Sequence, residues 1–196
     1  MSIRGLIGFR YQGIDKISYN HDGSNPEDLG RRVAHFCKVV PIAMMKRVVP
    51  NIQMVDESSV PTHEQIEKCR PWLDKGVSSG KETEWYCLLR KTQGDLSVFF
   101  REPVCEYMLD GRESSWIDFQ YIVNLDTGKL EVYAFTFDTP VLELDIETMP
   151  DHNTALAMMT EAIRAFEPEY MTVDEMMADI YSKIDIEKWM GGKGES

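Results

Sequence analysis

Residues 3–20 constrain the fold most strongly, because they read as two β-strands joined by a turn of fixed length. The two halves, IRGLIGFRY and IDKISYN, are rich in β-branched and aromatic residues, and Gly13 supplies the turn between them. Each residue of a strand advances about 3.3 Å, so a hairpin of equal arms returns to its starting point. The sequence therefore predicts that Asn20, His21 and Asp22 lie beside the start of the first strand.

A helix is predicted directly after this hairpin. Asn25 can cap its N-terminus, Pro26 suits its first position, and Glu27 and Asp28 follow where the helix dipole favours acids. Apolar residues then recur at helical spacing as far as Pro41. They are Leu29, Val33, Phe36 or Cys37, and Val40.

The middle of the chain gives a coarser prediction. Thr62 and Gln65 form a capping box that opens a short helix. Residues 82–100 fit either a helix pair broken near Gly94 or strands, and we favour helix. Residues 116–137 read as a second hairpin that turns at Asp126-Thr127-Gly128.

Two further helices are predicted in the last third, one capped by Asn153 and one opening at Thr172 with Glu175 three positions later. No repeat and no linker divides the chain. The order of elements predicts an α+β fold with antiparallel β-sheets and packed helices. We expect one domain over residues 1–190 and a flexible tail over residues 191–196.

Composition excludes several classes of protein. A hydrophobic content of 43% and a charged content of 28% are typical of a globular chain. Apolar runs are far shorter than the roughly 20 residues of a membrane helix, and the first residues do not resemble a signal peptide. The four cysteines show no zinc-type spacing, so we expect reduced, buried cysteines, no metal and no cofactor. These features predict a cytoplasmic protein.

Negative charge is concentrated at the end of the chain. Residues 141–196 contain 13 acids and four bases, which accounts for −9 of the net charge of −12. Such a segment repels nucleic acid and attracts basic partners. It forms either a docking surface or a solvated acidic face that aids solubility.

Ser2 is the candidate nucleophile. Removal of Met1 would leave a serine that carries both a hydroxyl and a free α-amine, whose pKa is ordinarily about 7.7–8.0. The neutral amine can take the hydroxyl proton, directly or through one water. This chemistry requires a rigidly held terminus, which the strand that follows would provide, and polar groups beside it, which Asn20 and Asp22 would provide.

This opening resembles that of the amino-terminal-nucleophile (Ntn) hydrolases, especially the choloylglycine and penicillin acylase branch. The shared features are a nucleophile before the first strand, a turn with glycine, a returning strand and an Asp about twenty residues on. The resemblance implies that Ser2 is the nucleophile, that Asp22 holds the amine and that Asn20 supplies polar contacts. It also implies a fold of two stacked antiparallel sheets. The branch generally uses Cys where this chain has Ser.

The chain also resembles uncharacterised phage and bacterial proteins that open Met-small-Thr-Arg and carry a segment like Y-x-x-x-D-G-x-P-x-G. The stretch YNHDGSNPEDLG, residues 19–30, is a loose version of that segment. This family carries no established activity. If the chain is phage-encoded, its location is the host cytoplasm.

Two functions are therefore predicted as alternatives. The first is hydrolysis of an amide bond with Ser2, Asn20 and Asp22 as the catalytic group. The second is a non-enzymatic acidic interaction protein that binds a basic host or viral protein, with no role for nucleic acid or a membrane. On that alternative Asp174, Glu175 and Asp179, around one turn of the last predicted helix, are the binding residues. The simplest interpretation gives Asn20-His21-Asp22 the role of a capped turn.

Overall fold

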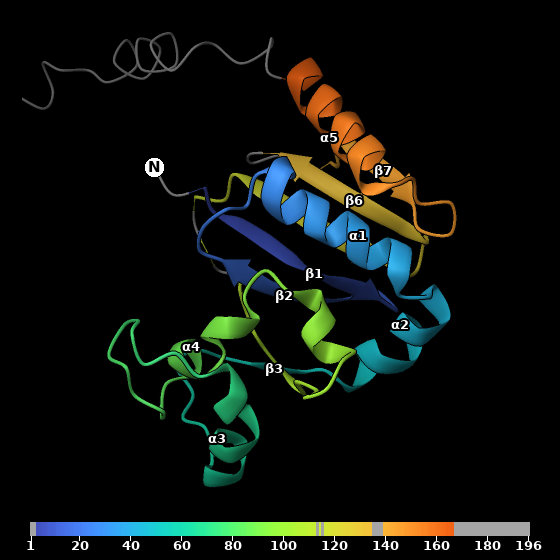
Figure 1. Cartoon of the computed structure of the whole chain (residues 1–196). Coiled ribbons are helices and arrows are strands. Elements are labelled where there is room, and N and C mark those ends of the chain that lie inside the picture. The colour runs from blue at the N-terminus through green and yellow to red at the C-terminus, as the bar shows by residue number, and fades with distance from the viewer. Residues whose placement is uncertain (1–2, 113, 115, 135–138, 167–196) are drawn as a thin grey trace, which may run out of the picture. The chain divides into compact units, whose positions relative to one another are not determined.

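The computed structural model describes residues 3–112, 114, 116–134 and 139–166 (Figure 1). Residues 1–162 form one compact unit and residues 163–196 a second, of which only the end of the last helix is described. The sheet, the core and the candidate sites all belong to the first unit. The predicted domain boundary at residue 190 lies outside the described residues.

The described part of the chain combines strands with helices, so the predicted α+β class is confirmed. The strands are β1 (Gly5–Tyr11), β2 (Ile14–Asn20), β3 (Gln53–Val55), β4 (Tyr107–Leu109), β5 (Phe119–Asn124), β6 (Lys129–Ala134) and β7 (Leu142–Asp145). The α-helices are α1 (Arg31–Val39), α2 (Ile42–Val48), α3 (His63–Cys69), α4 (Trp85–Leu88) and α5 (His152–Phe166). A π-helical turn, η1 (Pro26–Gly30), and the 3-10 turns η2 (Val49–Asn51), η3 (Arg70–Trp72), η4 (Arg90–Thr92) and η5 (Leu96–Phe99) lie between them.

The main sheet is mixed, which corrects the predicted antiparallel arrangement. Its strand order is β2-β1-β5-β6-β7, and β1 runs parallel to β5, with Ile7 opposite Tyr121 and Phe9 opposite Val123. The short strands β3 and β4 form a separate pair that is also parallel. The described strands thus form one five-stranded sheet and one two-stranded sheet. Parallel pairing joins strands that are distant in sequence, and local patterns do not predict it.

Both predicted hairpins are confirmed. In the first, Gly5 pairs with Asn20 and Tyr11 with Ile14. Its two turn residues, Gln12 and Gly13, have φ values of 54° and 70°, as the tight turn of a two-residue hairpin requires. In the second, β5 and β6 pair antiparallel around the predicted 126–128 turn.

Residues 82–100 do not form the helix pair that we favoured. They contain one turn of α-helix, α4, followed by η4 and η5. Gly94, where the break was predicted, has a φ of 72°, which interrupts a right-handed helix. The side chain of Asp95 then accepts a hydrogen bond from the Ser97 amide, at 2.9 Å, and starts the next turn.

Helix capping follows the sequence at two of the three predicted positions that the structure describes, and the fourth, Thr172, lies outside the described residues. The side chain of Asn25 accepts a hydrogen bond from the Asp28 amide, and Thr62 and Gln65 make the reciprocal capping box. Asn153 is not the cap of α5. The carboxylate of Asp151 accepts hydrogen bonds from the Asn153 and Thr154 amides instead, at 3.0 and 3.1 Å. Asp and Asn are equally good caps, so composition alone does not choose between the two positions.

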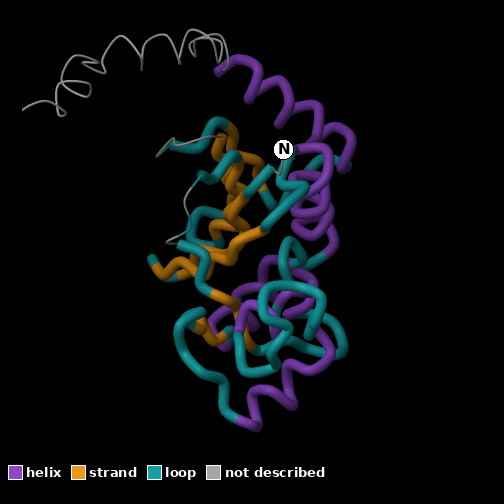
Figure 2. The backbone as a smooth tube through the Cα atoms, turned by 90° about the vertical axis from the view of Figure 1, so that its left-hand side faces the viewer, coloured by secondary structure: helices purple, strands orange, loops and turns teal. Residues whose placement is uncertain are grey.

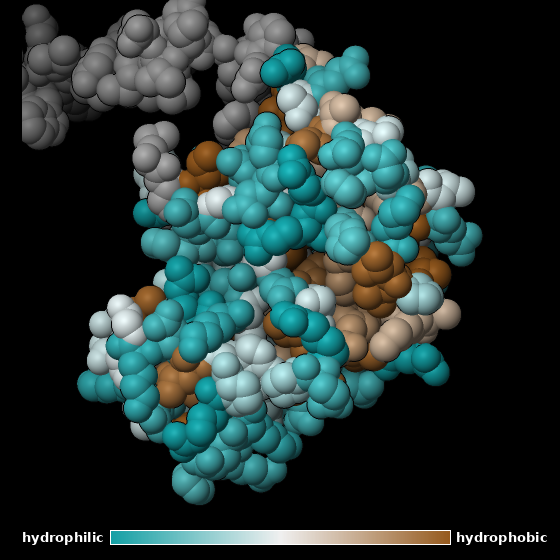
Figure 3. All heavy atoms as spheres, in the orientation of Figure 1, coloured by the Kyte–Doolittle hydropathy of each residue, from teal (hydrophilic) through white to brown (hydrophobic). Residues whose placement is uncertain are grey.

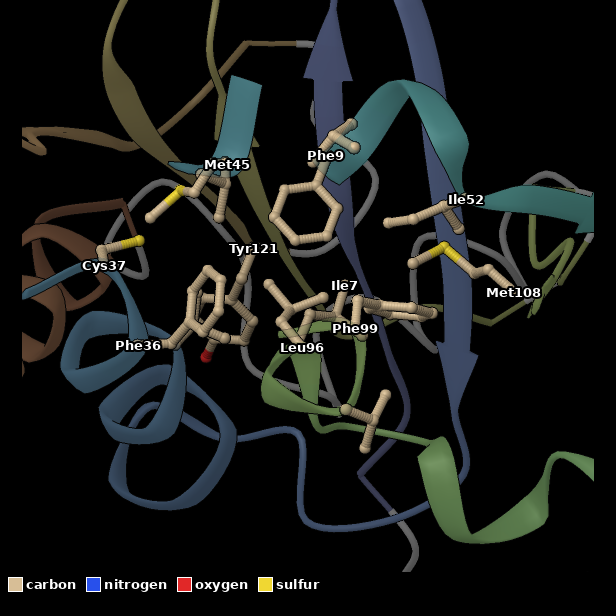
Figure 4. Packing of buried hydrophobic residues seen from close by; sticks show 14 of the residues in the cluster. Ile7, Phe9, Phe36, Cys37, Met45, Ile52, Leu96, Phe99, Met108 and Tyr121 are labelled. Carbon is tan, nitrogen blue, oxygen red and sulfur yellow. The ribbon is translucent and has the colours of Figure 1, made fainter. Parts of the chain in front are cut away.

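The hydrophobic core lies between the sheet and the helices on one of its faces (Figure 2). In Figure 4 the side chains of Phe9 and Tyr121 from the sheet point toward Phe36 of α1 and toward Leu96 and Phe99 of η5. All five are buried. Among the described residues, no helix is long and apolar enough to cross a membrane.

Candidate active site at the start of strand β1

The start of β1 is held in place by hydrogen bonds from two loops. The Ser24 amide donates to the Ile3 carbonyl oxygen at 3.1 Å, from the loop that follows β2. The Arg4 amide donates to the Asp118 carboxylate at 2.8 Å, and the Asp118 amide donates back to the Arg4 carbonyl oxygen at 3.0 Å. Backbone groups on both sides of residue 4 are therefore fixed. Ser2 itself lies outside the described residues.

Asn20 lies beside the start of β1, as the length of the hairpin predicts. It pairs with Gly5 and is only 5% exposed. Its side-chain amide donates to the Asp22 carbonyl oxygen at 2.6 Å and to Ser24 Oγ at 2.8 Å. In this geometry Asn20 shapes the loop after β2. Nothing in the described structure tests its predicted catalytic role.

Gly5 allows this loop to approach the first strand closely. A Cβ placed on Gly5 would lie 2.6 Å from the Cβ of Ser24 and 2.8 Å from the Phe119 carbonyl oxygen, distances that real side chains do not adopt. Ser24 is completely buried, and its carbonyl oxygen accepts a hydrogen bond from the Tyr121 hydroxyl at 3.0 Å. The loop is thus fixed against both β1 and β5.

Asp22 follows this fixed turn, and its side chain is exposed. Its main chain is held through the hydrogen bond that its carbonyl oxygen accepts from Asn20. The distance from Asp22 to Ser2 involves a residue outside the described part of the chain, so the role of Asp22 as the partner of the amine stays a prediction.

Sequence reasoning missed a group of aromatic and basic residues near the start of β1. The Tyr19 hydroxyl lies 3.4 Å from His21 Nδ1. Burial raises the pKa of Tyr19, and the positive charges of Arg4 and Arg90 partly oppose this shift. The guanidinium carbon of Arg90 lies 5.9 Å from the centre of the Tyr86 ring. These residues come from three separate segments, so no local motif could have revealed them.

Arg90 has an unsatisfied donor within this group. Its Nη1 donates to the side chain of Gln93, but its Nε is buried and has no hydrogen-bond partner in the described part of the chain. A buried donor without a partner is destabilising unless a ligand or water accepts from it.

The cysteines do not offer an alternative nucleophile. All four are buried and unpaired. Burial raises the pKa of Cys69 and of Cys105 to about 12, and it raises that of Cys37 still further, so these thiols are protonated near neutral pH. Among the described residues no three His, Cys, Asp or Glu side chains gather into a group that could hold a metal ion.

The acidic residues predicted for docking, Asp174, Glu175 and Asp179, lie outside the described residues. In the part of the acidic segment that is described, two exposed carboxylates have local structural roles. Asp145 accepts hydrogen bonds from the Glu147 and Thr148 amides, and Asp151 caps α5. Asp145 and Asp151 therefore stabilise a turn and a helix start, and the docking surface stays a prediction.

Comparisons of the chain with models of known protein families, with characterised proteins and with solved structures find no match.

Proposed function

We propose that this protein hydrolyses an amide bond by the amino-terminal-nucleophile mechanism, with Ser2 as the nucleophile. The observation that carries the proposal is the anchoring of Ile3 and Arg4 by the loops around Ser24 and Asp118. A nucleophile that supplies its own base must be held rigidly against its substrate, because small misplacements reduce the rate strongly. An anchored main chain directly after Ser2 meets that requirement.

The position of β1 in the sheet also supports the proposal. It is an interior strand, bonded to β2 on one side and to β5 on the other. A terminus that leads into an interior strand is constrained by neighbours on both sides. The mixed sheet differs from the two stacked antiparallel sheets of the hydrolase family, so the proposal rests on the chemistry of the terminus and not on the fold.

In the proposed mechanism, the neutral α-amine of Ser2 takes the hydroxyl proton while Oγ attacks the amide carbonyl carbon. The resulting ammonium then gives a proton to the leaving amine as the carbon–nitrogen bond breaks, which leaves an ester on Ser2. Water, activated by the same amine, attacks this ester, releases the acid and restores the serine hydroxyl. Asp22 would accept a hydrogen bond from the ammonium, and Asn20 would hold the loop in position.

The decisive experiment first measures the intact mass, because the mechanism requires that Met1 be absent. The protein is then treated with p-nitrophenyl acetate, and peptide mapping locates any acetyl group. We expect an acetyl ester on Ser2 in a reaction quenched in acid, which protonates the amine and so stops both hydrolysis and transfer of the acetyl group to nitrogen. Hydroxylamine should remove this ester, since it cleaves esters and leaves amides intact.

Two variants serve as controls for this reaction. Ser2→Ala should lose the hydroxylamine-sensitive adduct, and Ser79→Ala, at an exposed loop serine, should retain it. Retention of Met1, or equal labelling of wild type and Ser2→Ala, would contradict the proposal.

A further inference from the structure

A pocket of about 550 Å³ lies between α1, the turn η5 and the start of α5. Its walls combine basic, apolar and acidic side chains, namely those of Arg31, Arg32, His35, Phe36, Val39, Val40, Asp95, Ser97 and His152. This volume is within the range of pockets that bind small molecules, about 300–1,000 Å³.

The pocket carries positive charge in a chain whose net charge is −12. Arg31 and Arg32 lie on one wall, and the rings of His35 and His152 face each other with their centres 6.5 Å apart. Arg31, His35 and His152 form no ion pair or hydrogen bond through their side chains with other residues of the described ranges. Their donors are thus available to a ligand.

The single acid of the pocket, Asp95, is already satisfied by its neighbours. It accepts hydrogen bonds from the Ser97 amide and hydroxyl, at 2.9 and 2.5 Å, and from Arg101 at 2.7 Å. Its charge is therefore largely compensated by Arg101, and the remaining wall is basic. An anion would meet little repulsion there.

Part of the pocket wall is apolar. Phe36, Val39 and Val40 line it, and Val39 is 56% exposed. Figure 3 shows a patch of hydrophobic residues over the C-terminal end of α1, bordered by hydrophilic ones. Burying this surface under a ligand would be favourable.

We propose that this pocket binds an organic anion, in which a carboxylate or phosphate group is joined to an apolar group. Arg31, His35 and His152 bind the anionic group, and Val39 and Val40 contact the apolar group. Guanidinium and imidazole N–H groups are the usual donors to such oxygens. The proposal does not depend on the hydrolysis proposed above.

The pocket is structurally linked to Asn20, the last residue of β2. Arg32 Nη1 donates to the Gly94 carbonyl oxygen at 3.0 Å, and its Nε pairs with Asp28 at 3.1 Å. A Cβ placed on Gly94 would lie 2.7 Å from Asn20 Oδ1 and 3.3 Å from Arg32 Nη1. Arg32 of the pocket wall is therefore connected through Gly94 to Asn20, the residue that pairs with Gly5 of β1.

Binding is tested by calorimetric titration with phenyl phosphate, benzoate, inorganic phosphate and benzyl alcohol at low salt. We expect phenyl phosphate or benzoate to bind more tightly than either inorganic phosphate or benzyl alcohol, because only these probes engage both parts of the pocket. Absence of binding by both phenyl phosphate and benzoate at millimolar concentration would overturn the proposal.

Variants locate the binding site. Arg31→Ala should weaken binding of the tightest probe about tenfold, as loss of a charge-assisted hydrogen bond predicts. Arg47→Ala removes the same charge from an exposed position on α2, outside the pocket, and should leave affinity unchanged. Both residues are exposed, so circular dichroism should show folded proteins. Equal weakening by the two variants would indicate nonspecific attraction of anions and would overturn the assignment to this pocket.

Discussion

The two faces of the main sheet are held by different forces. On the face toward α1, alternate residues of the inner strands are apolar and buried; they are Ile7, Phe9, Tyr121, Val123, Leu130 and Val132. We call this the apolar face. The opposite, polar face carries a small cluster of Leu6, Ile17, Ile122 and Tyr133, and beside it Arg10, Asn124 and Glu131.

The polar face buries a carboxylate and satisfies it completely. Glu131 is 5% exposed. It accepts hydrogen bonds from Arg10 Nη1 at 3.0 Å, from Asn124 Nδ2 at 2.6 Å and from the Tyr133 hydroxyl at 2.7 Å. A buried charge of this kind is tolerated because three donors replace its water shell.

The sheet is thus stabilised by packing on one face and by hydrogen bonds and an ion pair on the other. A packed face is destabilised when side-chain volume is removed and a cavity remains. A polar network is destabilised when one hydrogen-bond partner is removed or changes its protonation state. The two faces should therefore respond to different variants and differently to pH.

The largest effect is expected on the apolar face, from Phe9→Ala. Phe9 is completely buried, and its ring centre lies 5.9 Å from that of Phe36 and 6.0 Å from that of Phe100. Removal of the ring should lower the free energy of unfolding by about 3–5 kcal/mol, because a cavity remains in the core. Urea denaturation at pH 7 measures this. A loss below about 1 kcal/mol would show that this face does not depend on packing.

A smaller loss is expected from Glu131→Ala on the polar face. The variant leaves Asn124 and Tyr133 without the Glu131 carboxylate as acceptor, and Arg10 keeps its ion pair with Asp15. The free energy of unfolding should fall by about 3 kcal/mol, as for other broken buried networks.

Asp15→Asn is the matched control for that experiment. Asp15 binds the same arginine, with Arg10 Nε 2.7 Å from Asp15 Oδ1, but both side chains are about one-third exposed. The free energy of unfolding of Asp15→Asn should fall by less than about 1 kcal/mol, since water replaces an exposed partner. Equal losses of unfolding free energy in Glu131→Ala and Asp15→Asn would contradict the expectation that the buried carboxylate contributes more than the exposed one.

These two faces also show what the sequence could predict. Each hairpin is local: its strands and its turn lie within about twenty residues, and both hairpins were predicted. The parallel contact of β1 with β5 joins residues more than one hundred positions apart, and neither propensity nor turn chemistry encodes it. The polar network depends on that contact, because Arg10 of β1 reaches Glu131 of β6 across β5.

In the candidate active site, too, the local contacts were predicted and the contacts between distant segments were not. Hairpin length was enough to place Asn20 beside Gly5. The anchoring of Arg4 by Asp118 was not predicted, because it requires β5 to lie next to β1. The pocket on α1 combines residues from three separate elements, and the sequence showed only an alternation of basic and apolar residues there.

A smaller loss than that of Glu131→Ala is expected from Tyr133→Phe, which removes one hydroxyl from the polar face and keeps the ring. At pH 7 the free energy of unfolding should fall by about 1–2 kcal/mol, the usual contribution of a hydrogen bond to a charged acceptor. Tyr121→Phe is the matched variant on the apolar face, where the hydroxyl donates to the neutral Ser24 carbonyl oxygen at 3.0 Å. The free energy of unfolding of Tyr121→Phe should fall by about 1 kcal/mol.

The stability of the protein at alkaline pH tests whether Tyr133 contributes through its hydroxyl as well as through the packing of its ring. Burial and the hydrogen bond to Glu131 raise the pKa of Tyr133 to about 12, above the ordinary value of about 10. The folded protein therefore keeps a proton that the unfolded chain releases, so this contribution to stability is complete below about pH 10 and is lost as pH rises toward 12. Urea denaturation of wild type and Tyr133→Phe between pH 8 and about pH 11 should show a shallower decline for the variant. Because Tyr121 and Tyr19 also have raised pKa values, some decline should persist in it. Parallel declines in the two proteins would mean that ionisation of Tyr133 does not destabilise the polar face.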